Sequence, residues 1–261
     1  MKRFGVILFV SLFILGAILL FQSNSDKQSN ELSLLEPKHT NREIHNVSSG
    51  DFFQYNVGSD IYRFDIPEGY GDATLLYEEI LKDSRLKFSL VSCFMPKEHV
   101  RERLNGNLPS ECEFLKIDIL KRSLDSKVSP EKFKEAIDSI SNSLPKITSR
   151  DHKFVQKGFM IANDQIKKVR GDDASIEVVS LTNLGAFHKD DLSLLWTQVM
   201  PFDFKFNGKI KRYSVVGVLG IFYLDGRGFY FTQAKEFKQG FNLKNLESNA
   251  LSYLKQIMKQ N

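Results

Sequence analysis

The sequence predicts an α+β fold: a curved antiparallel sheet flanked by helices, as in an αβα sandwich, preceded by one N-terminal hydrophobic helix. Three observations predict it: short segments that alternate apolar and polar side chains, two amphipathic helix patterns among them, and an uncharged apolar run at residues 4–21. Alternation with a period of two is typical of strands, whereas apolar positions three and four residues apart are typical of helices. Strands with helices interspersed among them pack as layers around a shared core.

The apolar run at residues 4–21 follows Lys2 and Arg3 and contains no charged side chain. As a helix it spans about 27 Å, which is close to the hydrocarbon thickness of a bilayer. Because the positive flank stays in the cytoplasm, we expect a single-pass membrane protein with its C-terminal domain outside the cytoplasm, on the periplasmic side of a bacterial inner membrane. Residues 1–21 fit an uncleaved signal anchor or a cleaved signal peptide, and cleavage would make the protein secreted.

Residues 22–50 contain few apolar side chains and no aromatic ones. Such a segment cannot bury enough surface to offset the entropy lost on ordering. We therefore predict a flexible polar tether at residues 22–50. No further polar linker divides residues 51–261, which predicts a single exported α+β domain there.

Strand patterns recur from residue 62 onward. The predicted strands with one apolar face lie at residues 62–66, 86–90, 115–119 and 176–181. We expect each of them to be half-buried in an antiparallel sheet.

The C-terminal half predicts a three-stranded meander. Residues 202–206 alternate up to Asn207–Gly208, a pair that favours a two-residue hairpin because both positions accept a positive φ. Residues 213–224 are apolar at both parities, as expected of a central strand covered on two faces, and a turn at residues 225–228 leads into the third strand. Pro201 indicates a bulge or an edge in the first strand.

Two helices have identifiable starts. Ser129 and Pro130 begin the first, which places Phe133 and Ile137 on one apolar stripe. The last helix begins near Asn242 and carries its own apolar stripe to the end of the chain. A third, shorter helix is predicted at residues 97–104.

Two segments resemble the PsbP/Mog1-like family. They are residues 61–70 (IYRFDIPEGY) and residues 213–236 (YSVVGVLGIFYLDGRGFYFTQAKE), the second followed by the closing helix. In that family an aromatic-rich strand near the start ends in Pro-x-Gly-aromatic. The resemblance implies an αβα sandwich and an accessory, non-catalytic binding role, without any particular partner. Residues 85–190 lie outside it.

Composition and charge exclude several classes of protein. With 42% hydrophobic and 26% charged residues, the chain is globular rather than disordered, collagen-like or coiled-coil. Its 36 basic and 32 acidic residues are interspersed without a basic stripe, so we expect no nucleic-acid partner. The histidines have no metal-ligand spacing, and no nucleophile or phosphate-binding motif is present. We therefore predict no catalytic residue, metal or cofactor.

The two cysteines, Cys93 and Cys112, are a candidate disulfide. In an oxidising compartment two thiols more often pair than stay reduced. Each lies out of phase with the apolar positions of its strand, so we expect both on the polar faces of neighbouring strands. Unpaired thiols and a catalytic thiol are the alternatives.

Four basic side chains surround the Asn207–Gly208 turn, on strands whose other face is expected to carry Phe202 and Phe204. They are Lys205, Lys209, Lys211 and Arg212. A basic hairpin tip can contact anionic lipid head groups or a partner. Alternatively, the charges protect an exposed strand edge from aggregation.

We therefore expect a membrane-tethered, exported accessory or binding module of the cell envelope, held by residues 4–21 and binding an envelope protein without catalysis. An enzyme of unrecognised type, with Cys93 or a carboxylate pair as its centre, is the alternative. A structural part of a larger membrane assembly is a third. A deep cleft with convergent polar groups would favour an enzyme, and a flat or grooved apolar patch would favour a binding module.

Overall fold

The computed structural model describes residues 40–47, 50–76, 88–105, 111–144, 153–170, 173–206 and 208–261. The predicted hydrophobic helix at residues 4–21 and most of the predicted tether lie outside these ranges. In the described ranges, no helix has the length and apolar character needed to cross a membrane.

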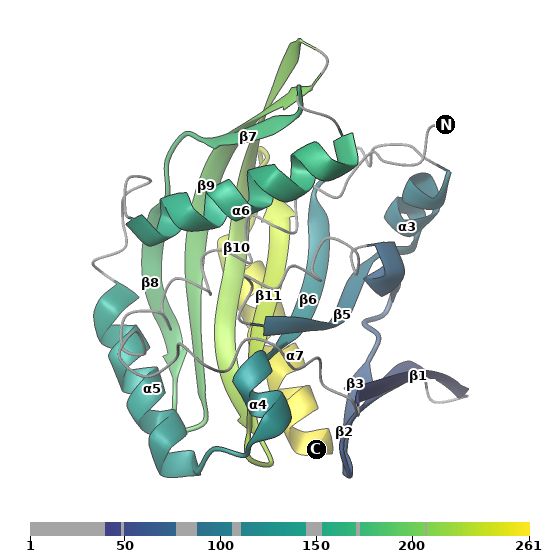
Figure 1. The fold of residues 1–261 in the computed structure, drawn as a ribbon, viewed down its shortest axis with the longest axis vertical. Helices are drawn as coiled ribbons and strands as arrows, with labels where there is room; N and C mark the ends of the chain where they lie inside the picture. The colour runs from purple at the N-terminus through teal and green to yellow at the C-terminus, as the bar shows by residue number, and fades with distance from the viewer. Residues whose placement is uncertain are drawn as a thin grey trace.

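A large antiparallel sheet forms the centre of the fold (Figure 1). Its strands are β4 (Tyr70–Asp72), β5 (Phe88–Pro96), β6 (Glu113–Leu120), β7 (Ser175–Val178), β8 (Thr182–Lys189), β9 (Ser193–Phe206), β10 (Lys209–Leu224) and β11 (Arg227–Glu236). They follow the order β4-β5-β6-β11-β10-β9-β7, and β8 also pairs with β9. The predicted meander of β9, β10 and β11 is confirmed.

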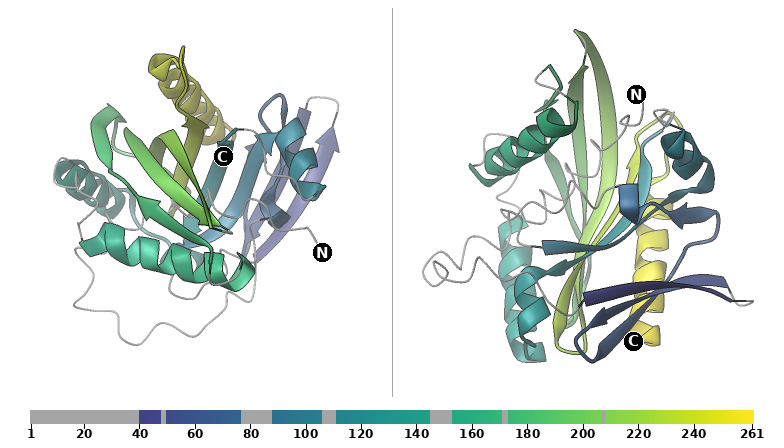
Figure 2. Two further views of the ribbon diagram at one scale, coloured as in Figure 1. Left: turned by 90° about the horizontal axis from the view of Figure 1, so that it is seen from above. Right: turned by 45° about the vertical axis from the view of Figure 1, so that its right-hand side comes forward.

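Helices cover this sheet on both faces. They are α3 (Lys97–Leu104), α4 (Lys121–Asp125), α5 (Pro130–Ser143), α6 (Lys153–Arg170) and α7 (Leu243–Gln260). Figure 2 shows α7 on the opposite side of the sheet from α5 and α6. Each face has its own cluster of buried side chains. The predicted class, an antiparallel sheet flanked by helices, is confirmed.

Three further strands, β1 (Thr40–Val47), β2 (Gly50–Val57) and β3 (Asp60–Asp65), form a small second sheet. It packs on the α7 face of the main sheet, where the Phe53 ring stacks on Phe64 at 5.1 Å and contacts Phe94 of β5 at 5.5 Å. Strand β1 comes from the predicted tether and pairs with β2 along its whole length. The folded part therefore begins before residue 51, because backbone pairing recruits a polar segment that has little apolar surface to bury.

The predicted helix starts are confirmed by their caps. Ser129 Oγ accepts a hydrogen bond from the Lys132 N–H, and Asn242 Oδ1 accepts one from the Asn245 N–H. Each bond satisfies a backbone donor that the first helical turn leaves without a partner. The short helix α3 is confirmed at its predicted bounds, whereas α6 was not predicted.

The expectation of half-buried strands is confirmed for β3 and β7, whose side chains alternate between buried and more exposed, and is wrong for β6. Strand β10 is buried on both faces from Val215 onward, as predicted. Every residue of β6 from Phe114 to Leu120 is also buried, because α7 and the small sheet cover one face and core side chains cover the other. Pro201 lies in β9 between the stretch that pairs with β8 and the stretch that pairs with β7. On that side of β9 its carbonyl oxygen accepts a hydrogen bond from the Val179 N–H.

Gly220 in β10 is expected to be sensitive to one added methyl group. A Cβ at Gly220 would lie 2.2 Å from Leu195 Cδ2 and 2.9 Å from the Leu194 carbonyl oxygen. We expect Gly220→Ala to lower the free energy of unfolding by about 1–3 kcal/mol, measured by urea titration, because the central sheet must open to admit the methyl group.

The matched control is Gly71→Ala, whose Cβ would have only ordinary contacts, the nearest at 3.5 Å from Val100. We expect it to change stability by less than about 0.5 kcal/mol. Equal losses in the two variants would contradict the steric explanation.

Candidate functional site

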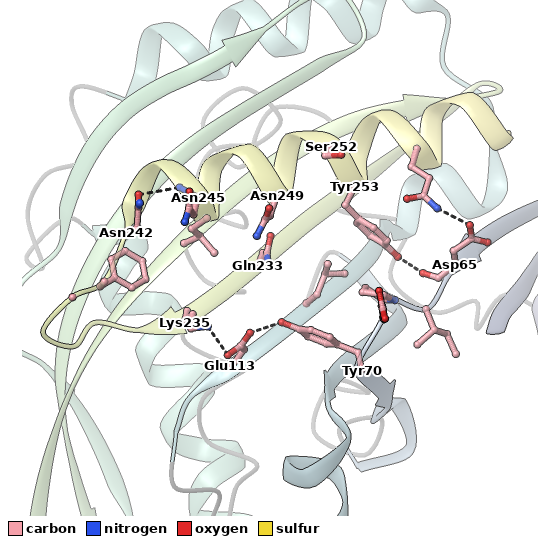
Figure 3. Close-up of a pocket in the computed structure, with 18 residues that line it drawn as sticks. Asp65, Tyr70, Glu113, Gln233, Lys235, Asn242, Asn245, Asn249, Ser252 and Tyr253 are labelled. Carbon is pink, nitrogen blue, oxygen red and sulfur yellow. Dashed lines mark hydrogen bonds and ion pairs between the residues drawn. The ribbon is translucent and has the colours of Figure 1, made fainter. Parts of the chain in front are cut away.

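An open groove of about 1030 Å³ lies between α7 and the segment that joins β3 to β4, with strands β6 and β11 as its floor (Figure 3). The polar residues that line it are Asp65, Glu68, Tyr70, Glu113, Gln233, Lys235, Asn242, Asn245, Asn249, Ser252, Tyr253 and Gln256. None of them was predicted from the sequence as a site residue.

The α7 wall of the groove is a polar stripe. Asn245, Asn249, Ser252 and Gln256 are four, three and four residues apart, so they lie along one line of the helix. The neighbouring stripe of α7 is buried against the main and small sheets. On the side that faces the groove, the buried stripe of α7 is therefore bordered by uncharged amides and a hydroxyl.

Hydrogen bonds fasten the C-terminal half of α7 to β3. The Tyr253 hydroxyl donates to the Asp65 carbonyl oxygen at 2.6 Å, and Gln256 Nε2 donates to Asp65 Oδ2 at 2.7 Å. At the end of the chain, Asn261 Oδ1 accepts from the Arg63 N–H at 2.7 Å. Burial raises the pKa of Tyr253 well above its usual value, so this phenol remains a donor. These contacts fix the spacing between the two walls.

A carboxylate on the floor has partners on both of its oxygens. The Tyr70 hydroxyl donates to Glu113 Oε1 at 2.5 Å, and Lys235 Nζ lies 3.0 Å from Glu113 Oε2. Burial, together with the contact to Glu113, raises the pKa of Tyr70, so its hydroxyl keeps its proton at neutral pH. Lys235 is the only cationic side chain among the described residues that line the groove, and it is therefore paired with an acid.

Other polar groups in the groove have no hydrogen-bond partner among the described residues. The Oε1 atom of Gln233 is buried without one. Figure 3 shows this amide pointing from β11 toward Asn249 on α7. The side chains of Asn245, Asn249 and Ser252 likewise make no hydrogen bond within the described ranges. The groove therefore offers uncharged donors and acceptors to a ligand.

The two cysteines lie elsewhere, in the core of the α5 and α6 face. Cys93 is 0% and Cys112 is 2% exposed, so the expected polar-face location is wrong for both. A bulge between Leu90 and Ser92 reverses the alternation of β5 and turns Cys93 inward. Cys112 does lie on the opposite face from the apolar positions of β6, but that face is itself buried.

The expected Cys93–Cys112 disulfide is not present in the structure. Cys93 pairs across the sheet with Lys116, which is four residues along the chain from Cys112. At the rise of a strand this is about 13 Å, well beyond the Cα separation of about 7 Å that a disulfide can bridge. In this position neither thiol reaches the groove.

The predicted basic cluster at the β9–β10 hairpin is divided between two faces. The hairpin projects beyond the rest of the sheet (Figure 1). Its register places Lys211 opposite Phe204 and Arg212 opposite Asp203. Directly opposed residues of an antiparallel pair share a face, so Lys211 lies on the phenylalanine face, contrary to expectation.

Lys205 and Arg212 lie on one face of the hairpin, and Lys209 and Lys211 lie on the other. Acidic neighbours neutralise Lys205 and Arg212 at 2.9 and 2.7 Å. Lys209 and Lys211 have no ion-pair partner within the described part of the chain. The lipid or partner contact of the tip stays a prediction, and it now depends on these two lysines.

A serine, a histidine and an aspartate meet at the β8–β9 turn without forming a catalytic triad. His188 Nε2 lies 2.9 Å from Ser193 Oγ and 3.2 Å from Asp190 Oδ2. In a triad the base uses its two ring nitrogens for the two partners, whereas here both partners meet the same nitrogen. The Ser193 hydroxyl donates to Asp190, so the group ties the turn together.

No protein-family model matches the chain, and no curated protein matches it either. Among solved structures, it is similar to the Ran-binding protein Mog1p of Saccharomyces cerevisiae. The identity is 10%, the match covers 85% of this chain and 92% of that chain, and the TM-score is 0.28. This similarity is weak and concerns the fold alone.

Proposed function

We propose that this protein is a membrane-tethered, exported binding module of the cell envelope, and that its ligand occupies the groove between α7 and the β3–β4 segment. The observation that carries the proposal is the row of uncharged polar groups, Asn245, Asn249 and Ser252 on α7 and Gln233 on β11, that have no partner within the described structure. Of these groups Gln233 Oε1 is buried, and a buried acceptor without a partner is costly, so a ligand would satisfy it. The three side chains on α7 are exposed and can bind the same ligand. The exported location rests on the apolar run at residues 4–21.

The chemistry of the groove supports binding more than catalysis. Its unengaged groups are amides and a hydroxyl, and the Glu113 carboxylate has partners on both oxygens. Cys93, the thiol proposed for the alternative enzyme, is fully buried on the other face of the sheet. The groove is open yet polar, so it matches neither the deep cleft nor the apolar patch expected from the sequence. Membership of the PsbP/Mog1-like family remains a hypothesis on which the proposal does not depend.

Site-specific crosslinking tests the groove. We expect a benzophenone amino acid at position 249 of the full-length protein to give a covalent adduct in illuminated intact cells. The same group at position 248 should give none, because Ser248 is also exposed on α7 but does not line the groove. Adducts are detected as a mass increase of the protein in the membrane fraction.

Equal labelling from positions 248 and 249, or no adduct from positions 233, 249 and 252, would contradict a ligand in the groove. A C-terminal reporter on the same protein tests the location independently. Activity of that reporter in the cytosol alone would refute export and leave the result for the groove unaffected.

A further inference from the structure

The length of the polar stripe on α7 indicates a linear ligand. From Asn245 to Gln256 the helix rises about 17 Å, at 1.5 Å per residue. The groove beside it has a volume of about 1030 Å³, at the upper end of the range for small-molecule pockets. An oligomer of several units fits these dimensions better than a single small metabolite.

The charges that line the groove disfavour an anionic ligand. Three acids, Asp65, Glu68 and Glu113, line it against a single cation, Lys235, which is already paired with Glu113. Like charges brought together in a partly buried site are destabilising. Nucleic acids, sulfated glycans and polyuronates are therefore poor candidates, and a neutral ligand is favoured.

The floor of the groove disfavours a peptide bound as an added strand. Such a peptide is held mainly by the free backbone groups of a strand at a sheet edge. Here the floor is the face of β6 and β11, and each of these strands pairs with a neighbour on both sides. Only side chains, such as Gln233, are left to bind a ligand. Amides and hydroxyls that both donate and accept match sugar hydroxyls, which do the same.

An aromatic pair at the N-terminal end of α7 adds a second feature of the same kind. The Phe241 ring lines the groove, and its centroid lies 5.5 Å from that of Phe237. Phe237 is 55% exposed. A neutral sugar ring has an apolar face of C–H groups, and that face packs on an exposed aromatic ring without needing a charge.

From these features we infer that the groove binds a linear, neutral oligosaccharide. Its hydroxyls hydrogen-bond to Asn245, Asn249, Ser252 and Gln233, and one terminal ring packs on the Phe237–Phe241 pair. The inference rests on the proposed function and narrows it to one ligand class.

Ligand-observed saturation-transfer NMR on the full-length protein in lipid nanodiscs tests the inference. The neutral probes are cellotetraose, chitotetraose and maltotetraose, and a capped neutral hexapeptide and tetragalacturonate are the competing ligands. We expect at least one neutral tetrasaccharide to bind, and Asn249→Leu and Gln233→Leu each to weaken its binding about tenfold. Ser248→Leu should leave the affinity unchanged. Both groove variants should fold, since one is exposed and the other removes a buried oxygen that has no partner.

The alternative outcomes separate this inference from the proposed function. Binding of the hexapeptide or of tetragalacturonate that Asn249→Leu weakens, without tetrasaccharide binding, would overturn the glycan and keep the groove as the binding site. Tetrasaccharide binding that is equal in Asn249→Leu and the unmodified protein would place the sugar elsewhere and overturn the inference. If no probe binds, the neutral glycan is refuted, and crosslinking from position 249 then decides whether the groove binds anything else.

Discussion

Replacing Asp118 by leucine is expected to lower the free energy of unfolding by about 3–5 kcal/mol, whereas the double replacement Lys116→Met, Asp118→Leu leaves it unchanged or raises it. The two residues lie on the same face of β6, in the core beneath α5 and α6. Lys116 is 0% and Asp118 is 2% exposed. The Lys116 ammonium contacts Asp118 Oδ2 and lies 5.1 Å from the centroid of the Phe88 ring.

The physical reason is the cost of removing charge from water. Burial lowers the pKa of Lys116 and raises the pKa of Asp118, so the surroundings disfavour the charged form of each group. Asp118 Oδ1 also has no hydrogen-bond partner among the described residues. The attraction between the two groups therefore offsets only part of the free-energy cost of their desolvation, whereas one charged member left alone offsets none of it. Two apolar side chains of similar volume avoid the cost altogether.

Urea unfolding of the two single variants and the double variant measures this coupling. The control is Asp138→Leu, which removes the exposed ion pair of Asp138 with Lys189, 2.7 Å apart, and is expected to cost less than about 1 kcal/mol. A double variant less stable than the unmodified protein would show that the pair itself stabilises the core, contrary to this prediction.

Local signals account for the parts of the fold that the sequence predicts correctly. The caps at Ser129 and Asn242 act within three residues of their partners, and they mark both helix starts. The tight turn between β10 and β11 requires a positive φ at Asp225 and Gly226, which have φ values of 39° and 87°. Features of this kind depend on the backbone of a few neighbouring residues, so they are visible in the chain itself.

Helix α6 shows what happens when such signals are weak. Gly158 lies inside it and lowers the helix propensity of the segment. The apolar positions Phe159, Ala162 and Ile166 do have helical spacing, and Ala162 and Ile166 are buried. The spacing of these positions alone indicates a helix, although Gly158 weakens the pattern.

Contacts between distant parts of the chain determine the features that the sequence does not predict. The bulge in β5 that turns Cys93 inward has no local mark, because no glycine or proline stands in residues 88–93. The groove is assembled from α7, two strands and the segment between β3 and β4. Its polar stripe on α7 is visible in the sequence, but nothing in the sequence places Tyr70 and Gln233 opposite it.

Replacing Arg227 by methionine is expected to lower the free energy of unfolding by about 3 kcal/mol, because this buried guanidinium joins three parts of the chain. It donates to Asp60 Oδ2 of β3 at 2.7 Å through Nη2, and through Nη1 to the Leu124 carbonyl oxygen of α4 at 3.2 Å and to the Ser123 carbonyl oxygen. The sequence predicts only a turn at this position. Arg227→Lys should recover little of the loss, since an ammonium cannot reproduce the planar arrangement of donors.

The pH dependence separates the ionic part of this effect from the rest. Hydrogen bonds from Arg227 and Lys127 hold the pKa of Asp60 below its usual value. A carboxyl with a lowered folded pKa contributes its stability above the unfolded pKa of about 3.9 and loses that contribution as pH falls through the folded pKa. The difference between the unmodified protein and Arg227→Met, measured by urea unfolding, should therefore shrink below about pH 4. It should not vanish, because the bonds to the α4 carbonyls do not titrate.

The control variant is Lys127→Met, which removes a half-exposed amine 3.0 Å from Asp60. It should lower the free energy of unfolding by less than about 1 kcal/mol. A stability difference that is the same at pH 7 and pH 2.5 would show that Arg227 acts through the carbonyls alone.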